Sequence, residues 1–209
     1  TSPDGNLMRV QAGALDGKLL IEYYDTSYNF KRAMTLDLSL PIFGAFYESN
    51  DNYYILTGQN NPDHNDSVET YRVTKYSKDW KAQGSCSLFG ANTAQPFAFG
   101  TARMMVSGNY LYVRTCHVMY NGHQANVTFS VNTSDMSIMD QYYKVEYTPS
   151  GYVSHTFTQF LKMDNGTFLG VDQGDTYPRG INLVKSTIDS STGRFTKNFS
   201  TSVIMDFTL

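Results

Sequence analysis

Short runs in which apolar and polar residues alternate recur along this chain, and clusters of turn-forming residues separate them. Three of these runs, residues 52–58, 109–115 and 166–172, align with one another at a constant offset of 57 residues. Alternation places successive side chains on opposite faces of an extended strand, and turn residues at this spacing indicate hairpins. The pattern therefore predicts a repeated unit built from antiparallel strands.

Each repeated unit is predicted to contain four strands in a meander, named A, B, C and D in chain order. The aligned run is strand B. A short apolar run and a tight turn precede it as strand A, and a polar loop and an alternating run follow it as strand C. A further turn and strand complete the unit as strand D. The predicted A strands are residues 43–47, 103–106 and 157–163, and the predicted C strands are residues 68–76, 126–131 and 181–186.

The N-terminal segment fits the same unit from strand B onward, with strands predicted at residues 7–11, 18–24 and 31–38. Residues 24–30 align with residues 74–80, and both segments span a C–D turn that ends in an aromatic residue, Phe30 or Trp80. The chain is thus expected to hold three complete units and three strands of a fourth.

A four-stranded meander cannot bury both of its faces alone, whereas the radial packing of a β-propeller covers the faces and leaves only short edges. We therefore predict an all-β fold, a single propeller or propeller-fragment domain over residues 1–209 with about 3.75 blades. A β-sandwich and an open β-solenoid are the alternatives. Because the first unit lacks strand A, we expect an arc of a larger propeller, completed by missing blades or by a second copy of the chain. The predicted blades are residues 7–40, 41–98, 99–150 and 151–209.

Composition agrees with a β fold and narrows the function. Hydrophobic residues make up 41% of the chain, charged residues 17% and aromatic residues 14%, and aromatic side chains favour pleated, half-buried surfaces. The net charge is −3 and no basic stripe exists, so nucleic-acid binding is set aside. No apolar stretch is suited to crossing a membrane. Cys86 and Cys116 match no zinc spacing and are expected to be free, half-buried thiols.

The B–C loops carry the most unusual polar residues. In a propeller these loops share one face with the D–A loops, and loops on a rigid scaffold are a usual place for function. All four histidines lie in these loops or at a D–A entry, together with carboxylates and arginines. The predicted binding residues are Arg103, Arg114, His117, His155, Asp172, Asp175 and Arg179.

These residues also have a purely structural interpretation. Arg114 and His117 end a predicted strand and could hydrogen-bond neighbouring blades, since buried polar groups must be paired. Asp172 and Asp175 are ordinary turn residues, and Arg179 could pair with Asp175.

No common catalytic or metal-binding pattern is complete. Asp63, His64 and Asp66 are clustered without a recognised ligand spacing, so neither a metal nor a cofactor is predicted. Cys116 and His117 are neighbours on a strand and point to opposite faces, which argues against a thiol–base pair. Glycoside hydrolysis needs two facing carboxylates, and the obvious partner for the 172–179 loop is Asp63, on another blade.

Several strings in and around these loops resemble a repeat region of large secreted or surface proteins from gut Clostridia and related Firmicutes. The resemblance covers residues 51–186, although the loop after His117 is usually longer in that family. It implies an extracellular setting and a larger parent protein, and it implies no reaction. The strings are Gly90-Ala-Asn92 with Pro96-Phe97, Tyr110-Leu-Tyr-Val-Arg-Thr-Cys-His117, His123-Gln-Ala-Asn126, Gly151-Tyr-Val-Ser-His155 and residues 172–179.

Two functions follow as hypotheses. The first is a non-catalytic binding or scaffold module, secreted or on a bacterial cell surface, whose ligand is a glycan or another protein met by the B–C loop face. The second is an extracellular carbohydrate-active enzyme, a glycosidase or lyase, with a funnel on the same face. The funnel would be lined by Arg103, Arg114, His117, His155, Asp172 and Arg179.

Overall fold

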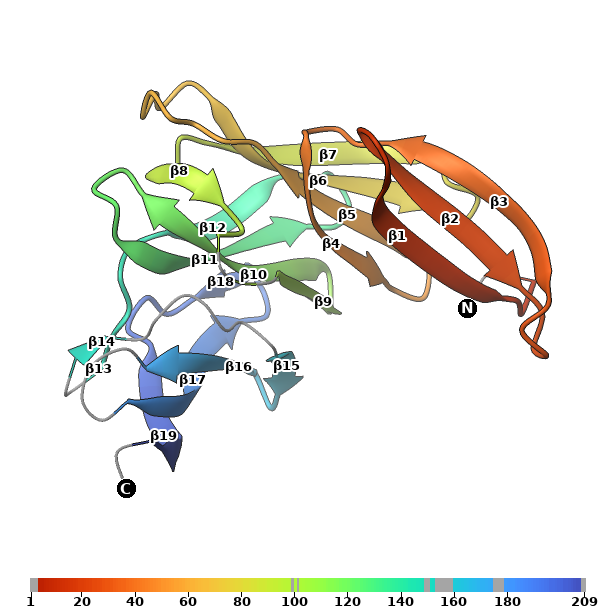
Figure 1. Cartoon of the computed structure of the whole chain (residues 1–209). Coiled ribbons are helices and arrows are strands. Elements are labelled where there is room, and N and C mark those ends of the chain that lie inside the picture. The colour runs from red at the N-terminus through yellow and green to blue at the C-terminus, as the bar shows by residue number, and fades with distance from the viewer. Residues whose placement is uncertain are drawn as a thin grey trace.

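The computed structural model of the chain describes residues 4–98, 100, 102–148, 151–152, 160–174 and 179–207, which form strands and turns without a helix (Figure 1). The strands are β1 (Leu7–Leu15), β2 (Lys18–Tyr24), β3 (Phe30–Asp37), β4 (Ile42–Glu48), β5 (Asn52–Gly58), β6 (Glu69–Ser77), β7 (Ala82–Phe89), β8 (Thr93–Pro96), β9 (Arg103–Ser107), β10 (Tyr110–Met119), β11 (Gln124–Asn132), β12 (Ile138–Tyr142), β13 (Tyr147–Thr148), β14 (Gly151–Tyr152), β15 (Phe160–Asp164), β16 (Thr167–Gly174), β17 (Gly180–Asp189), β18 (Arg194–Phe195) and β19 (Ser200–Asp206).

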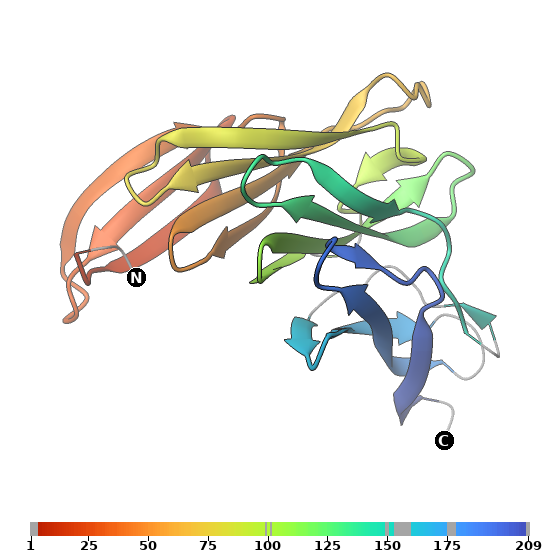
Figure 2. The ribbon, with the colours of Figure 1, turned by 180° about the vertical axis from the view of Figure 1, so that it is seen from behind.

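Most of these strands form four antiparallel sheets of three to five strands, numbered here in chain order, and β13 and β14 pair separately as a two-stranded sheet. The first contains β1, β2 and β3, and the second contains β4 to β7 in sequential order. The third is the meander β9–β10–β11–β12 with β8 added beside β10, and the fourth is β15–β16–β17–β19 with β18 beside the end of β17. The sheets follow one another along a curved row with the two termini at opposite ends (Figures 1 and 2).

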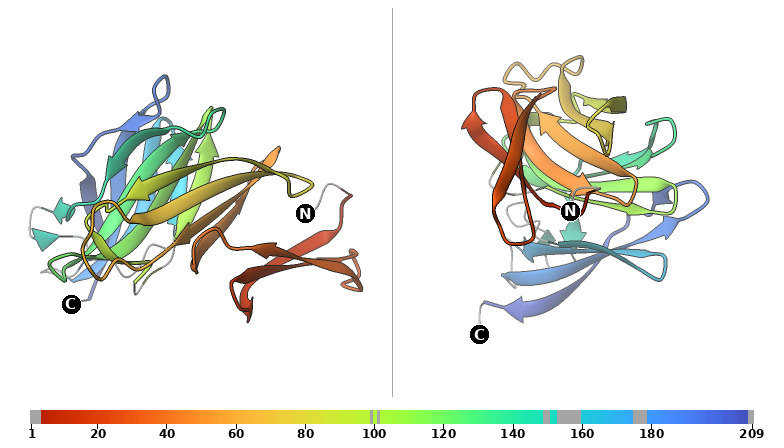
Figure 3. Two further views of the ribbon diagram at one scale, coloured as in Figure 1. Left: turned by 90° about the horizontal axis from the view of Figure 1, so that it is seen from above. Right: turned by 90° about the vertical axis from the view of Figure 1, so that its right-hand side faces the viewer.

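The sheets are arranged as propeller blades. The predicted A strands β4, β9 and β15 are neighbours in space, with β9 between the other two. Meander sheets whose first strands gather together, and whose faces cover one another, are the blades of a propeller. The predicted all-β fold of repeated propeller blades is therefore confirmed, and views from above and from the side show the same succession of sheets (Figure 3).

Each pair of consecutive sheets buries an apolar layer. Between the first and second sheets it includes Leu19, Ile21 and Trp80, and between the second and third it includes Leu56 and Val113. The layer against the fourth sheet is smaller and rich in phenylalanine, with Phe168, Phe195 and Phe199 around Val184. Burial of these alternating positions, at about 25 cal/mol per Å² of apolar surface, is the main force that joins the blades.

Two of the predicted strand B ends were wrong. The prediction ended strand B of the third sheet at residue 115, whereas β10 continues to Met119 and pairs with β11 as far as Val118↔Gln124. Asp172 likewise lies inside β16, opposite Asn182, rather than in a loop. His117 and Asp172, which lie in these parts of the two strands, are fully buried. The gain from burial outweighs the tendency of such polar residues to form turns.

The structure also corrects one consequence of the 57-residue offset. Tyr53 packs towards the first sheet beside Trp80, whereas Tyr110, 57 residues later, donates a hydrogen bond from its hydroxyl to the Ser191 carbonyl of the fourth sheet. Leu111 is the residue that faces the preceding sheet. A shift of one residue moves a side chain to the opposite face of a strand. The residue of the third sheet that matches Tyr53 in orientation is therefore Leu111, and the two sheets match at an even rather than an odd offset.

Phe97 packs between the second and third sheets, just after β8. Strands β8 and β9 pair with different parts of β10. The chain leaves the sheet between β8 and β9, and Phe97, at the start of that excursion, has a φ of 58°. A Cβ atom on Gly44 would lie 2.4 Å from the Phe97 ring, and one on Gly58 would lie 2.8 Å from it. The two glycines are therefore required because the ring packs directly on the backbone of the second sheet.

Candidate functional site

A buried arginine is one of the links between the third sheet and the fourth. Arg114, in the middle of β10, is fully buried, and so are the side chains of Glu146 and Asp172. Nη1 and Nη2 of Arg114 donate to the two Glu146 oxygens at 2.7 and 2.8 Å, and Nε donates to Asp172 Oδ2 at 3.2 Å. Nη2 also donates to Asp172 Oδ2, and Nη1 donates to Thr128 Oγ1 at 2.8 Å. These five hydrogen bonds match the five N–H donors of a guanidinium.

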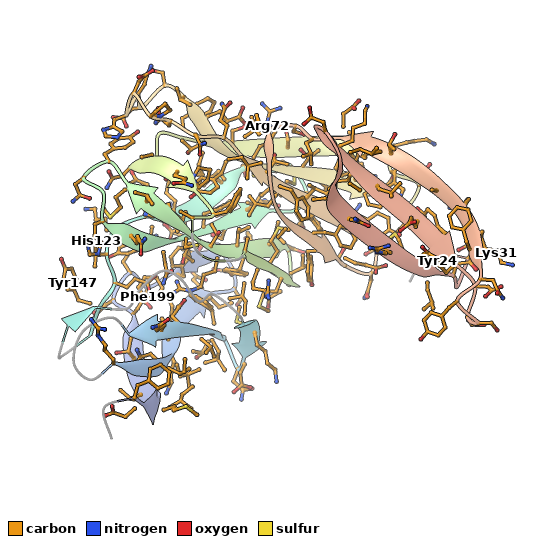
Figure 4. All side chains as sticks on the ribbon, in the orientation of Figure 1. Tyr24, Lys31, Arg72, His123, Tyr147 and Phe199 are labelled. Carbon is orange, nitrogen blue, oxygen red and sulfur yellow. The ribbon has the colours of Figure 1, made fainter. Side chains whose placement is uncertain are left out.

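Neighbouring strands build the space for this arginine. Thr128 lies directly opposite Arg114 in the β10–β11 register. On the facing sheet, a Cβ atom at Gly170 would lie 3.2 Å from Arg114 Nε, so the absence of a side chain lets the guanidinium approach β16. The rings of Phe168 and Phe199 lie 5.6 and 5.7 Å from Arg114 Cζ, within the range of a cation–π contact. Figure 4 shows Phe199 between the third and fourth sheets.

The electrostatics of this cluster keep Arg114 charged. Burial alone lowers the pKa of Arg114, but Asp172 and Glu146 more than offset it and raise that pKa above its usual value. Ions taken out of water are stable only with close partners, and removal of one partner leaves an uncompensated buried charge. The arrangement therefore locks two blades together and offers no exposed atom of Arg114 to a substrate.

His117 is buried on the opposite face of the same strand. Its Nδ1 lies 2.7 Å from the Thr93 hydroxyl, and its ring faces the second sheet. The Cys116 thiol instead donates to the carbonyl of Ala98 at 3.2 Å. The prediction that Cys116 and His117 point to opposite faces is confirmed, and they do not form a thiol–base pair.

Both thiols are predicted to be unreactive in the folded protein. Cys86 and Cys116 are free and buried, deeper than the half-buried thiols expected from the sequence, and burial raises the pKa of each to about 12. Because the thiolate is the reactive form, we expect a disulfide reagent at pH 8 to label them roughly a thousandfold more slowly than in denaturant. Absorbance of the released thiolate measures the rate, and equal rates in the native and unfolded protein would contradict the assignment.

The structure also describes Arg103 and Arg179 among the predicted site residues. Arg103 is partly buried in β9 and donates from Nη1 to the Ala102 carbonyl at 2.9 Å. Arg179 is exposed, and its carbonyl accepts a hydrogen bond from the Phe207 amide at 2.7 Å. His155 and Asp175 lie outside the described residues. Of the predicted set, the structure brings Arg114 and Asp172 into contact and turns His117 the other way.

Sequence reasoning missed Glu146 and Thr93, which are partners of the buried candidates Arg114 and His117. Glu146 follows Arg114 by 32 residues and lies between β12 and β13, and Thr93 precedes His117 by 24 residues in the short strand β8. Neither residue belongs to a motif, so only the packing of sheets reveals these pairs. One general rule could have indicated Glu146: a buried arginine needs a carboxylate partner.

A second cluster, called here the loop-end cluster, consists of the buried Asn61 and of His64, Asp66 and Tyr120, which are exposed or partly exposed. The rings of His64 and Tyr120 stack with centroids 4.8 Å apart at an interplanar angle of 17°. The Tyr120 hydroxyl donates to Asp66 Oδ1 at 2.9 Å and accepts from Asn61 Nδ2 at 3.1 Å. The cluster joins the β5–β6 loop to the β10–β11 turn, at the upper left of Figure 1.

Buried backbone contacts make the loop-end cluster rigid. Asn61 is 1% exposed, its amide nitrogen donates to the Ala94 carbonyl, and its side chain hydrogen-bonds the backbone of Asn65 in both directions. Gly90 has a φ of 60°, and a Cβ atom there would lie 2.6 Å from Asp66 Oδ1. An exposed His64 ring, a partly exposed Tyr120 ring and an exposed carboxylate are thus held in fixed positions, which is the arrangement that a binding surface needs. We identified His64 and Asp66 from the sequence as a clustered set, but not the contribution of Tyr120.

Within the ranges that the structure describes, no group of three or more His, Cys, Asp or Glu side chains could hold a metal ion. The same residues include no helix long and apolar enough to span a membrane.

Comparisons with known proteins give distant structural matches. No protein family and no curated protein matches the sequence. A Synechocystis apocarotenoid oxygenase variant matches with a TM-score of 0.48 and 9% identity over 96% of this chain and 46% of its own, and a chimera of that enzyme with RPE65 has a TM-score of 0.47 at the same identity and coverage. A variant of the GH43 protein BlXynB from Bacillus licheniformis has a TM-score of 0.32 and 10% identity over 74% of this chain and 42% of its own.

This chain therefore spans less than half the length of these structures. Because of their low identities and TM-scores, the description of the fold depends on the strand pairing and the contacts between sheets alone.

Proposed function

We propose that this chain is a non-catalytic binding module of a secreted or surface-exposed bacterial protein. Its ligand, a glycan or another protein, is met at the B–C loop face, and the chemistry of the loop-end cluster favours a glycan. The observation that carries the proposal is the fixed stack of the exposed His64 ring on the partly exposed Tyr120 ring, beside Asp66. Aromatic rings offer an apolar contact for a sugar ring, and the adjacent carboxylate accepts hydrogen bonds from hydroxyl groups.

The buried arginine cluster supports a binding role over an enzymatic one. Three members of the hypothetical catalytic funnel, Arg114, His117 and Asp172, have 0% exposure. Catalytic groups must reach the reacting atoms, whereas the hydrogen bonds described for these residues join them to other side chains of the chain. Their chemistry stabilises the interface between blades, so the scaffold interpretation accounts for them without a substrate.

The rigidity of the scaffold supports the same conclusion. The β5–β6 loop and the β10–β11 turn belong to different sheets, and the Tyr120–Asp66 and Tyr120–Asn61 hydrogen bonds hold them together. A preformed surface loses less conformational entropy when a ligand binds than a mobile loop does. The second and third blades thus present one continuous binding surface at their loop end.

Binding to a panel of soluble polysaccharides, followed by titration calorimetry on any that bind, tests the proposal. We expect Tyr120→Ala and His64→Ala to weaken binding about tenfold or more, because each removes one ring of the stack. Asp79→Ala is the matched control, since Asp79 is in the β6–β7 turn at the opposite end of the second sheet, and it should bind as the parent chain does.

Three results would overturn parts of the proposal. Absence of binding to every polysaccharide would exclude the glycan and leave a protein ligand for this face. Equal binding by the Tyr120→Ala variant would exclude the loop-end cluster as the site. Release of reducing sugar ends during incubation would favour the enzyme hypothesis instead.

A further inference from the structure

A polar pocket lies between the second and third sheets, at the end away from the loop-end cluster. Its volume is about 510 Å³, within the range of about 300–1,000 Å³ that is typical of small-molecule sites. Its walls include the β4–β5 turn and the β9–β10 turn. Strands β5 and β10 each run from one of these turns towards the loop-end cluster (Figure 1). We call this space the turn-end pocket, and its lining includes Tyr47, Glu48, Asp51, Val106, Asn109 and Thr133.

Hydrogen bonds between the two sheets hold the walls of the pocket in place. The Val106 amide of β9 donates to the Tyr47 hydroxyl of β4 at 3.1 Å. Lys75 of β6 donates from Nζ to the Thr133 carbonyl of the third sheet at 2.7 Å. Thr133 in turn donates from its amide and from its hydroxyl to the Asn109 carbonyl, each at 2.9 Å. The pocket is therefore preformed, and a ligand that enters it does not have to order these segments.

The β4–β5 turn is also held in one conformation. The Ser49 amide donates to the Asn52 carbonyl at 2.9 Å, and the Asn52 amide donates to the Ser49 hydroxyl at 3.0 Å. Lys78, just after β6, donates from Nζ to the Ser49 carbonyl at 2.7 Å and to Glu48 Oε1 at 2.8 Å. Asp51 belongs to the same turn and is exposed, so its carboxylate lies at the rim of the pocket on a fixed backbone.

The chemical groups around the pocket are suited to a polyhydroxylated ligand. The Tyr47 hydroxyl accepts a hydrogen bond from an amide and retains its own proton to donate. The exposed side chains of Asn109 and Asp51 add an amide and a carboxylate. The Tyr47 and Tyr54 rings, with centroids 6.3 Å apart, supply apolar surface beside these groups. Sugar rings combine hydroxyl groups with apolar C–H faces, so they match this mixture of donors, acceptors and aromatic carbon.

The charges around the pocket favour a neutral ligand. The two lysines nearby are already engaged, Lys78 by Glu48 and Lys75 by the Thr133 carbonyl. A uronate or a phosphate group would therefore bring a second negative charge close to Asp51, and like charges repel. A cation would meet a carboxylate that is exposed to water and salt, which weaken the attraction. A neutral sugar avoids the repulsion and still uses the Asp51 oxygens as hydrogen-bond acceptors.

We propose that the turn-end pocket binds a neutral sugar, either a monosaccharide or one unit of a longer glycan. Tyr47 and Asn109 donate hydrogen bonds to its hydroxyl groups, and Asp51 accepts hydrogen bonds from them. The pocket and the loop-end cluster lie at opposite ends of the same two sheets and share no residue. Binding at the pocket is therefore independent of the function proposed for the loop-end cluster.

Amide NMR of the isotope-labelled chain, titrated with glucose, galactose, mannose and N-acetylglucosamine, tests the proposal. Gly108 lines the turn-end pocket and reports on it, whereas Gly122, two residues after Tyr120, reports on the loop-end cluster. We expect the Gly108 signal to move with at least one sugar, with a Kd of about 1 mM. Glucuronate and galacturonate should bind there about tenfold more weakly than the neutral sugar, because of repulsion by Asp51.

Two variants connect the binding to the named side chains. Asn109→Ala should raise the Kd measured at Gly108 about fivefold, and Asp51→Ala about tenfold, because each removes one hydrogen-bonding group. Both side chains are exposed, so we expect the fold to be retained, and the amide spectrum of each variant shows this directly. Tyr120→Ala, at the opposite end of the sheets, is the matched control and should leave the Kd at Gly108 unchanged.

The two reporter signals separate this proposal from the function proposed above. A Gly108 signal that stays unchanged with all four sugars would overturn the turn-end site, even if Gly122 moved. A Gly108 signal that moves while Gly122 does not would support the turn-end site alone. Equal Kd values at Gly108 for the parent, Asn109→Ala and Asp51→Ala would overturn the assignment of the residues. Uronates that bind as tightly as the neutral sugars would overturn the choice of a neutral ligand.

Discussion

Replacement of Arg114 by Met is expected to lower the free energy of unfolding by about 3–5 kcal/mol, or to prevent folding at ordinary temperature. The substitution keeps most of the side-chain volume but removes the cation that Glu146 and Asp172 share in the buried interface. Two carboxylates would then remain buried without a compensating charge. Urea denaturation followed by far-ultraviolet circular dichroism measures the change.

Two further variants separate the charge from the packing. Arg72→Met removes a partly exposed ion pair with Glu69 in the second sheet, and it should cost no more than about 1 kcal/mol. The triple variant Arg114→Met, Glu146→Leu, Asp172→Leu removes all three charges together, and it should be more stable than Arg114→Met alone. An Arg114→Met protein as stable as the parent would contradict the structural role assigned to the cluster.

Replacement of Trp80 by Ala is the second change with a large expected effect, about 3–5 kcal/mol of unfolding free energy. The indole is 7% exposed, stacks on Tyr53 at a centroid distance of 4.5 Å and donates a hydrogen bond to Tyr23 of the first sheet. The substitution leaves a cavity between two blades and removes the partner of a buried hydroxyl. Because Trp80 is the chain's only tryptophan, thermal unfolding is best followed by circular dichroism rather than by fluorescence.

Tyr28→Ala is the matched control because Tyr28 has the same turn conformation with an exposed ring. Because the Tyr28 ring is exposed, this substitution should change the free energy of unfolding by no more than about 0.5 kcal/mol. Trp80→Phe, which keeps a smaller ring in the interface, should give an intermediate loss. If Tyr28→Ala and Trp80→Ala destabilised the isolated chain equally, the first sheet would have to bury Tyr28 in a way that the structure does not contain.

Both large effects concern contacts between sheets rather than pairing within a sheet. Arg114 joins the third sheet to the fourth, and Trp80 joins the second to the first. The strand hydrogen bonds of each meander remain in both variants. If the blades unfolded independently, each substitution would affect one part of the melting curve, whereas a single shifted transition would indicate that the blades fold cooperatively.

Most of the strand positions could be predicted from the sequence because the alternation of side chains is a local signal. Strand β5 has the predicted bounds, Asn52–Gly58, and β2 also has the predicted bounds, Lys18–Tyr24. Predictions failed where a strand continued through polar residues, as β10 does beyond Arg114 to His117 and Met119. Polar residues usually indicate a loop, and only the facing sheets show that these are buried and paired.

The candidate site was predictable only in part for the same reason. The sequence pointed to Arg114 and Asp172 as important polar residues, and the structure brings them together. It could not show that they face inward, because the choice between a loop face and a blade interface depends on the neighbouring sheet. The stacked pair His64 and Tyr120 comes from segments 56 residues apart, and no local pattern connects them.

The sequence by itself determined the repeated meander, the position of its turns and the all-β class, since each of these follows from the period of two along a strand and from turn-forming residues. The tertiary structure alone decided which face of each strand meets which sheet. A shift of one residue, as between Tyr110 and Leu111, reverses that choice. It also decided that Arg114 is a buried connection rather than a ligand contact, because its partner carboxylates lie 32 and 58 residues away and meet it only when the third and fourth blades pack together.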